Sequence, residues 1–203
     1  MSNPDINELY TRLNKIIGTI TDEKLRNAMF EMVDDNKYPF CAAPASSHTE
    51  FGGAYTGGLL QYCINTARIL RRLDNATASK IPMNDIIVAG LFHHFGKIGY
   101  YTNSNGEIIP VYVKNNSDWH IQRGIMYDIS PEYKNTNHNI TSLYYLHKYA
   151  AKHGANLSFD VINAISTMHT KPNAFAHENA EIYGVSELTI LLQSASRMAW
   201  KQF

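Results

Sequence analysis

The chain has 203 residues, 44% of them hydrophobic, which suits one domain over residues 1–203 with a sizeable core. Its 18 basic and 18 acidic side chains give a formal net charge of zero, which argues against a binder of a nucleic-acid polymer. The two cysteines match no metal-ligand spacing and are too few for a disulfide framework. With a polar amino-terminal segment and no apolar run of membrane-spanning length, we expect a cytoplasmic protein without a membrane partner.

Helical periodicity dominates the chain. Asn3 and Pro4 are the expected start of the first helix, and Thr21 that of the second. Gly154 is expected to close a later helix, and Ser186 to begin the last one. The apolar periodicity predicts helices over residues 3–18, 21–35, 59–73, 83–97, 139–154, 158–170 and 186–203, with a short helix within 117–129.

Two segments are not helical in pattern. Residues 39–58 are rich in Pro, Ser, Gly and aromatic residues, and they predict a long ordered loop of the kind that often carries function. Residues 100–113 predict a β-hairpin with "NSNG" as its turn. The expected fold class is therefore mostly α with one small hairpin.

The stretch "GLFHHFGKIGY" contains the most distinctive histidines of the chain. His93 and His94 end an apolar helix beside a Gly-Lys pair, whereas His147, His153 and His177 lie among polar residues and are expected on solvated surface. A lone buried histidine is usually a satisfied core residue. An adjacent pair can border one pocket if the helix lies along it, although neighbouring helical side chains point about 100° apart. The pair beside Gly-Lys thus favours a site.

The segments "GGLLQYCINTARIL" and "IIVAGLFHHFGKIGYY" together resemble the HD superfamily of metal-dependent phosphohydrolases. The resemblance extends over roughly residues 40–200, where "NNSDWHIQRGIMYDISPEY" and "AISTMH" are similar to segments of small phage-encoded HD proteins. It implies a single HD-like helical bundle. In that family two histidines and two aspartates bind a divalent metal that activates water for phosphate-ester cleavage.

The same resemblance implies that the ligand set is altered. Only His93 matches a family ligand. Tyr62 stands at the first histidine, His94 at the aspartate of the adjacent pair, and Ser196 at the distant aspartate. Hard divalent cations require carboxylate or other oxygen ligands, and a neutral phenol is a poor substitute. We therefore expect no catalytic residue of the usual mechanism, and a pocket that has lost its negative charge.

Further pocket candidates surround this motif. Lys97 and Arg123 could hold phosphate, and a base could stack on Trp119, with solvated or core roles about equally expected for all three. Phe51 and Tyr55 could form an aromatic lid. Four others complete the expected ligand-binding set: His120, His138, His169 and Arg197. His138 and His169 enter because they match histidines of the phage-type relatives.

Three functions from different classes follow. The first is capture of a small nucleotide or nucleotide-derived signal without cofactor; in a phage setting, capture would sequester a host defence signal in the host cytoplasm. The second is a phosphohydrolase with a rebuilt site, in which His94, His138 and His169 hold one divalent metal ion such as zinc. The third is a protein-interaction module. Helical proteins of this kind often form dimers, so a homo-oligomer is compatible with each.

Overall fold

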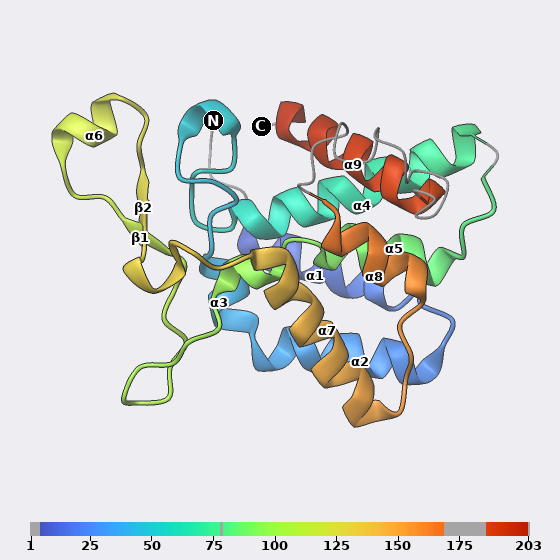
Figure 1. The fold of residues 1–203 in the computed structure, drawn as a ribbon. Coiled ribbons are helices and arrows are strands. Elements are labelled where there is room, and N and C mark those ends of the chain that lie inside the picture. The colour runs from blue at the N-terminus through green and yellow to red at the C-terminus, as the bar shows by residue number, and fades with distance from the viewer. Residues whose placement is uncertain (1–4, 78, 169–185, 203) are drawn as a thin grey trace, which may run out of the picture.

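A computed structural model describes residues 5–77, 79–168 and 186–202 of the chain. This part is mostly helical with one small antiparallel sheet, which confirms the predicted fold class (Figure 1). The sheet pairs β1 (Tyr112–Lys114) with β2 (Tyr127–Ile129). The helices are α1 (Ile6–Ile17), α2 (Glu23–Asp35), α3 (Lys37–Ala42), α4 (Gly58–Thr77), α5 (Met83–Phe92), α6 (Asp118–Gln122), α7 (His138–His153), α8 (Phe159–Ser166) and α9 (Glu187–Ala199), with 3₁₀ turns at η1 (Thr49–Phe51), η2 (Phe95–Ile98), η3 (Pro131–Tyr133) and η5 (Trp200–Gln202).

The helix ends test the predicted start and stop residues. Ser186 caps α9 by accepting a hydrogen bond from the Thr189 N–H, and Gly154 ends α7 in the left-handed conformation at φ 63°, so both predictions are confirmed. The prediction for α2 was off by one residue, because the Asp22 carboxylate, a stronger acceptor than the Thr21 hydroxyl, caps it. Asn3 and Pro4 lie outside the described residues, and Asp5 caps α1.

Helix packing forms one contiguous apolar core. α4 runs between α9, α5 and α1, so its side chains are buried along much of its length (Figure 1). On the other side of the molecule, α7 packs against α2 and against η2. α5 carries apolar residues on every face, and Ile86 to Phe92 are all buried. The segment that follows α5, from residue 93 onward, therefore begins in the interior of the protein.

The small sheet lies elsewhere than predicted. Residues 100–113 form the expected turn at Asn103–Gly106, but only an isolated bridge between Thr102 and Ile108 flanks it. The regular ladder instead joins β1 to β2, which follows α6, so the 117–129 segment is a helix and then a strand. Together β1, α6 and β2 form an arm that extends away from the helices (Figure 1). When a helix separates two paired strands in the chain, the sequence shows no local periodicity that indicates the pairing, whereas "NSNG" is a strong local turn signal. The hairpin was therefore predicted at the turn.

The predicted 39–58 loop is shorter than expected. Its first residues belong to α3, and η1 interrupts the remainder. Backbone hydrogen bonds then attach the loop to the arm: the Thr49 N–H donates to Gly124 O (2.9 Å), and the Met126 N–H donates to Ser47 O (2.9 Å). The loop is thus held between α4 and the arm.

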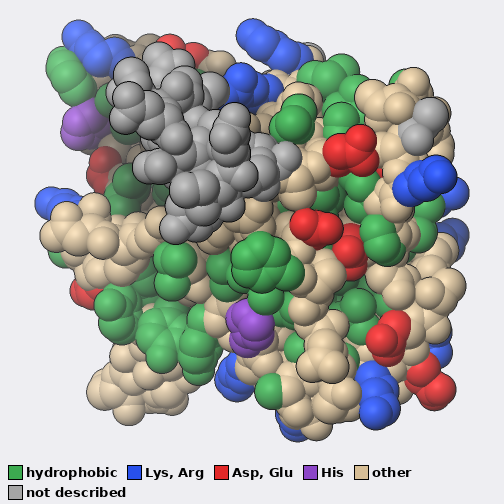
Figure 2. All heavy atoms as spheres, turned by 45° about the vertical axis from the view of Figure 1, so that its right-hand side comes forward, with side chains coloured by type: hydrophobic (Ala, Val, Ile, Leu, Met, Phe, Trp, Pro, Cys, Tyr) green, Lys and Arg blue, Asp and Glu red, His purple; other side chains and the backbone are tan. Residues whose placement is uncertain are grey.

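The surface shows no concentration of one charge on the face drawn in Figure 2. Among the described side chains visible there, basic and acidic groups are interspersed, as the zero net charge suggests. In the described ranges, none of the helices combines the length and apolar character needed to cross a membrane.

Candidate functional site

The two adjacent histidines are delivered to the interior by the end of α5. His93 is 0% exposed and His94 1% exposed, because the helix that precedes them is buried on all sides. The Nδ1 atom of His93 lies 3.1 Å from the carbonyl oxygen of Gly90, which orients that ring against the last turn of α5. The rings of His93 and His94 are 4.3 Å apart between centroids. The two imidazole rings therefore lie side by side in the interior, although neighbouring helical side chains point about 100° apart.

Ser142 on α7 fixes the segment that carries them. Its hydroxyl accepts a hydrogen bond from the Gly96 N–H (2.8 Å), and its own proton is within reach of the carbonyl oxygens of His138 (2.8 Å) and His93 (3.1 Å). A Cβ on Gly96 would lie 2.2 Å from the carbonyl oxygen of His138, so only glycine permits this approach. Sequence reasoning missed Ser142, because a serine among the apolar residues of α7 carries no signal of its partner.

Tyr62 and Ser196 meet beside the histidine pair. Tyr62 is 0% exposed, and its phenol oxygen is hydrogen-bonded to the Ser196 hydroxyl. Its ring stacks on His94, with centroids 5.3 Å apart and planes 19° apart. Burial raises the pKa of Tyr62, with the Ser196 hydrogen bond acting in the opposite direction, so the phenol is neutral at physiological pH. Three segments, α4, the end of α5, and α9, thus bring together the four positions that the family resemblance aligns with metal ligands.

The three-histidine metal site predicted from the sequence is placed only in part. His138 lies beside His94, with ring centroids 4.9 Å apart, so these two members of the predicted three-histidine site are neighbours. His169, the third member, and His177 lie outside the described residues. Within the described ranges, His, Cys, Asp and Glu side chains form no group of three or more that could hold a metal ion.

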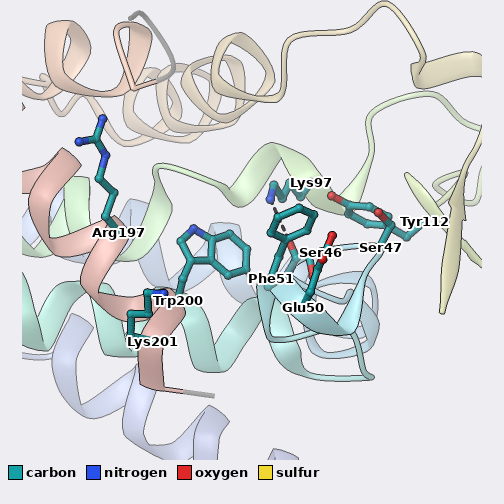
Figure 3. A pocket seen from close by; sticks show the side chains of 10 residues that line it. Ser46, Ser47, Glu50, Phe51, Lys97, Tyr112, Arg197, Trp200 and Lys201 are labelled. Carbon is teal, nitrogen blue, oxygen red and sulfur yellow. Dashed lines mark hydrogen bonds between the residues drawn. The ribbon is translucent and has the colours of Figure 1, made fainter. Parts of the chain in front are cut away.

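Tyr62, His93, His94 and Ser196 form a buried cluster, and a cleft of about 590 Å³ opens beside it, since Trp200 lines the cleft and contacts Tyr62. Figure 3 shows the side chains that line the cleft. Lys97, Phe51 and Tyr112 lie toward one end of it, Arg197 and Lys201 lie at the end formed by α9, and Trp200 lies between them (Figure 3). The lining also includes Ala45, Ser46, Ser47 and Glu50. Three residues of the expected ligand-binding set, Phe51, Lys97 and Arg197, are therefore brought together here.

Trp200 joins the cleft to the buried cluster. The Trp200 ring packs on the Tyr62 ring, with 4.3 Å between their centroids. The Lys97 ammonium lies 5.4 Å from the centroid of the Trp200 ring. Sequence reasoning missed Trp200, although a usable signal was present. It follows Ser196 by four residues on a helix, and that spacing places two side chains on the same face.

Lys97 is an unusual lysine. It is only 8% exposed, and its ammonium donates a hydrogen bond to the carbonyl oxygen of Ala45 at 2.7 Å. None of the ion pairs formed among the described residues includes it. Burial lowers the pKa of Lys97 to about 8, against a smaller opposing effect of Cys63, so it remains mainly charged at pH 7. Lys97 is therefore buried at the cleft and is not solvated at the end of a helix.

Four predicted pocket residues neither line the cleft nor belong to the group of Tyr62, Ser196 and the neighbouring histidines. Trp119, His120 and Arg123 lie on or beside α6, at the end of the arm (Figure 1). Trp119 is 55% exposed, and the Arg123 guanidinium stacks 3.7 Å from its ring centroid, so they contact each other. Tyr55 donates its phenol hydrogen bond to Gln61 (2.7 Å) and does not line the cleft. The residues of "DWHIQRG" did not indicate that β1 and β2 on either side would hold this segment apart from the helices.

No protein-family model matches this chain, and comparisons with curated proteins and with solved structures find no match either. The HD resemblance consequently remains an expectation from sequence motifs. What the site offers is its own geometry: a buried tyrosine-histidine cluster, and beside it a cleft with basic and aromatic side chains.

Proposed function

We propose that this chain is a degenerate HD-like protein that binds a small, phosphate-bearing nucleotide or nucleotide-derived molecule in the cleft and captures it without hydrolysis. The observation that carries the proposal is Lys97. A lysine that is 8% exposed and makes no ion pair with a described carboxylate is costly to bury, and an anion in the cleft would offset that cost.

The other residues of the cleft suit the same ligand class. Arg197 and Lys201 add two positive charges, and Glu50 is the one acidic side chain of the described lining. A charge-assisted hydrogen bond to phosphate contributes about 1.5–3 kcal/mol. The rings of Phe51 and Trp200 offer faces on which a base can stack, which contributes about 1–3 kcal/mol per base. Three such hydrogen bonds and one stacked base together contribute about 5.5–12 kcal/mol, a range that includes the roughly 8 kcal/mol of micromolar affinity.

The buried cluster does not suit the metal that the family resemblance implies. Its donors would be a neutral phenol already hydrogen-bonded to Ser196, a serine hydroxyl and two imidazoles. Hard divalent cations favour carboxylate oxygens, and the resemblance places neither of the two family aspartates in this chain. We therefore derive no hydrolytic step through a metal at Tyr62, His93, His94 and Ser196.

One observation favours a second candidate function. The contact between His94 and His138 supplies two of the three imidazoles proposed for a rebuilt metal site. Metal analysis of purified protein separates the two candidates. About one equivalent of zinc per chain, with nucleotide turnover that a chelator abolishes, would favour the enzyme.

The test of capture is calorimetry of purified protein against nucleoside phosphates, ADP-ribose derivatives and cyclic dinucleotides. We expect binding by at least one member, and recovery of that ligand with unchanged mass after heat release. Lys97→Met should weaken binding at least about tenfold, because it removes one charged contact at nearly constant volume. Lys148→Met, on exposed surface of α7, is the matched control. A degraded ligand would point to an enzyme, and absence of binding across the panel to an interaction module.

A biological setting follows only from the resemblance to small phage-encoded HD proteins. If this chain acts in that setting, capture would lower the free concentration of a nucleotide signal in the host cytoplasm. An abundant protein of micromolar affinity meets this requirement, because sequestration needs binding sites in excess of the signal and no turnover. Ligand recovered from cells that express the protein would identify the signal directly.

A further inference from the structure

A second cavity, of about 730 Å³, is also lined by Lys97. It is bounded by the start of α3, the 106–114 segment and β2, and three tyrosines line it: Tyr38, Tyr112 and Tyr127. Both cavities fall within the size range of small-molecule sites, roughly 300–1,000 Å³.

The two cavities share part of their boundary. Lys97 and Tyr112 line both of them. Ala43 and Pro44 line the second cavity, and the next residues, from Ala45 to Ser47, line the first. Because the Lys97 ammonium is bonded to the carbonyl oxygen of Ala45, the positive charge lies where the two cavities adjoin.

The two cavities differ in charge. The lining of the first contains three basic residues, Lys97, Arg197 and Lys201, and the single carboxylate of Glu50. In the second, Lys97 and Lys114 are balanced by Asp35 and Glu107. Phosphate is thus favoured at Lys97 and toward α9, whereas the balanced cavity, with its tyrosine and proline faces, favours an uncharged ring.

We propose that the ligand contains two ring systems joined through phosphate, as in a dinucleotide or a nucleoside diphosphate linked to a sugar. One ring lies against Phe51 and Trp200, the bridging phosphate lies at Lys97, and the second ring lies among the tyrosines of the second cavity. This inference rests on the proposed function, since it assigns the ligand class of the same site.

The test compares one-ring and two-ring probes by calorimetry. AMP has one nucleoside on its phosphate and is the one-ring probe. The two-ring probes carry a second group across the phosphate bridge: a second adenosine in the linear dinucleoside monophosphate ApA, and a second sugar in ADP-ribose. Because an added stacking contact is worth about tenfold or more in affinity, ApA or ADP-ribose should bind at least about tenfold more tightly than AMP. Which of the two gains more identifies the second ring as a base or a sugar.

A variant assigns the gain to the second cavity. Tyr38 is 85% exposed, so Tyr38→Ala should fold normally, and it should remove most of the advantage of the two-ring probe while leaving AMP binding unchanged. Tyr144→Ala, at a tyrosine of α7 that is 44% exposed and lines neither cavity, is the matched control. Tyr127→Leu is a second test within the same cavity.

The outcomes separate this inference from the proposed function. If AMP binds in a Lys97-dependent manner but ApA and ADP-ribose bind no more tightly, the first cavity holds the entire ligand and the two-ring inference is wrong. The same holds if Tyr38→Ala weakens one-ring and two-ring probes equally. If no member of the full panel of nucleoside phosphates, ADP-ribose derivatives and cyclic dinucleotides binds, the proposed function itself is overturned.

Discussion

The hydroxyl groups of Tyr62 and Ser196 are hydrogen-bonded to each other, although the residues are 134 positions apart in the chain. Tyr62 comes from α4 and Ser196 from α9, two helices that pack side by side. The family resemblance assigned both positions to one ligand shell without any knowledge of the fold. Their contact means that a pair of neutral hydroxyls occupies this place.

The Tyr62–Ser196 pair should be energetically coupled. Tyr62→Phe leaves the buried Ser196 hydroxyl short of a partner, which costs about 1–3 kcal/mol of unfolding free energy. In a double-mutant cycle with Ser196→Ala, measured by urea unfolding, we expect a coupling energy of about 0.5–3 kcal/mol. Additive effects of the two single changes would mean that the hydroxyls contribute independently.

Restoration of the implied ligand set should restore metal binding. The triple change Tyr62→His, His94→Asp and Ser196→Asp places two imidazoles and two carboxylates in the cluster. Manganese affinity, measured by calorimetry, should rise by orders of magnitude over that of the original chain. The matched control, Tyr62→His with His94→Asn and Ser196→Asn, has nearly the same shape without the carboxylate charges. A folded triple variant that binds manganese no better than this control would contradict the alignment of Ser196.

Lys97 should give stability a distinctive pH dependence. Its pKa is lowered from 10.5 to about 8 by burial, so between these values the unfolded chain binds more protons than the folded one. Stability due to this group therefore rises as the pH increases from about 8 to 10.5, by up to about 3 kcal/mol, and the cost of burying the charge is constant below that window. Cys63, whose pKa burial raises to about 12, stays neutral throughout.

The free energy of unfolding can be measured by urea unfolding for Lys97→Met and for the original chain at several pH values from about 7 to 10. The difference between the two proteins at each pH gives the contribution of Lys97. The variant should lack the rise and should be the more stable protein at pH 7. Lys148→Met should follow the original chain at every pH. An identical pH dependence in Lys97→Met would show that Lys97 titrates normally, contrary to its burial.

The two tryptophans should differ in ligand binding. Trp200 lines the cleft, whereas Trp119 lies on the exposed arm. Trp200→Leu should reduce nucleotide affinity about tenfold by loss of a stacking face, and Trp119→Leu should leave it unchanged. Calorimetry with the tightest probe of the panel measures both. If the ranking is reversed, the arm rather than the cleft binds the ligand.

Features that depend on local periodicity and on the chemistry of neighbouring side chains can be predicted without the fold. The mostly helical class, the cap at Ser186 and the stop at Gly154 follow from side chains that act within one or two turns. The burial of His93 and His94 also follows locally, because the apolar residues of α5 leave no polar face toward water.

Contacts between segments that are distant in the chain required the three-dimensional fold. β2 pairs with β1, and α6 lies between them in the chain. Because no local periodicity indicates this pairing, the sequence predicted the sheet at residues 100–113 instead. Lys97 becomes a buried cation only because the 43–47 segment and Trp200 cover it, and a lysine near a helix end is ordinarily solvated. Trp119 is carried away from the cleft while Trp200 is brought to it. The burial of a side chain and its contacts with distant residues depend on the whole fold, so short-range sequence patterns do not predict them.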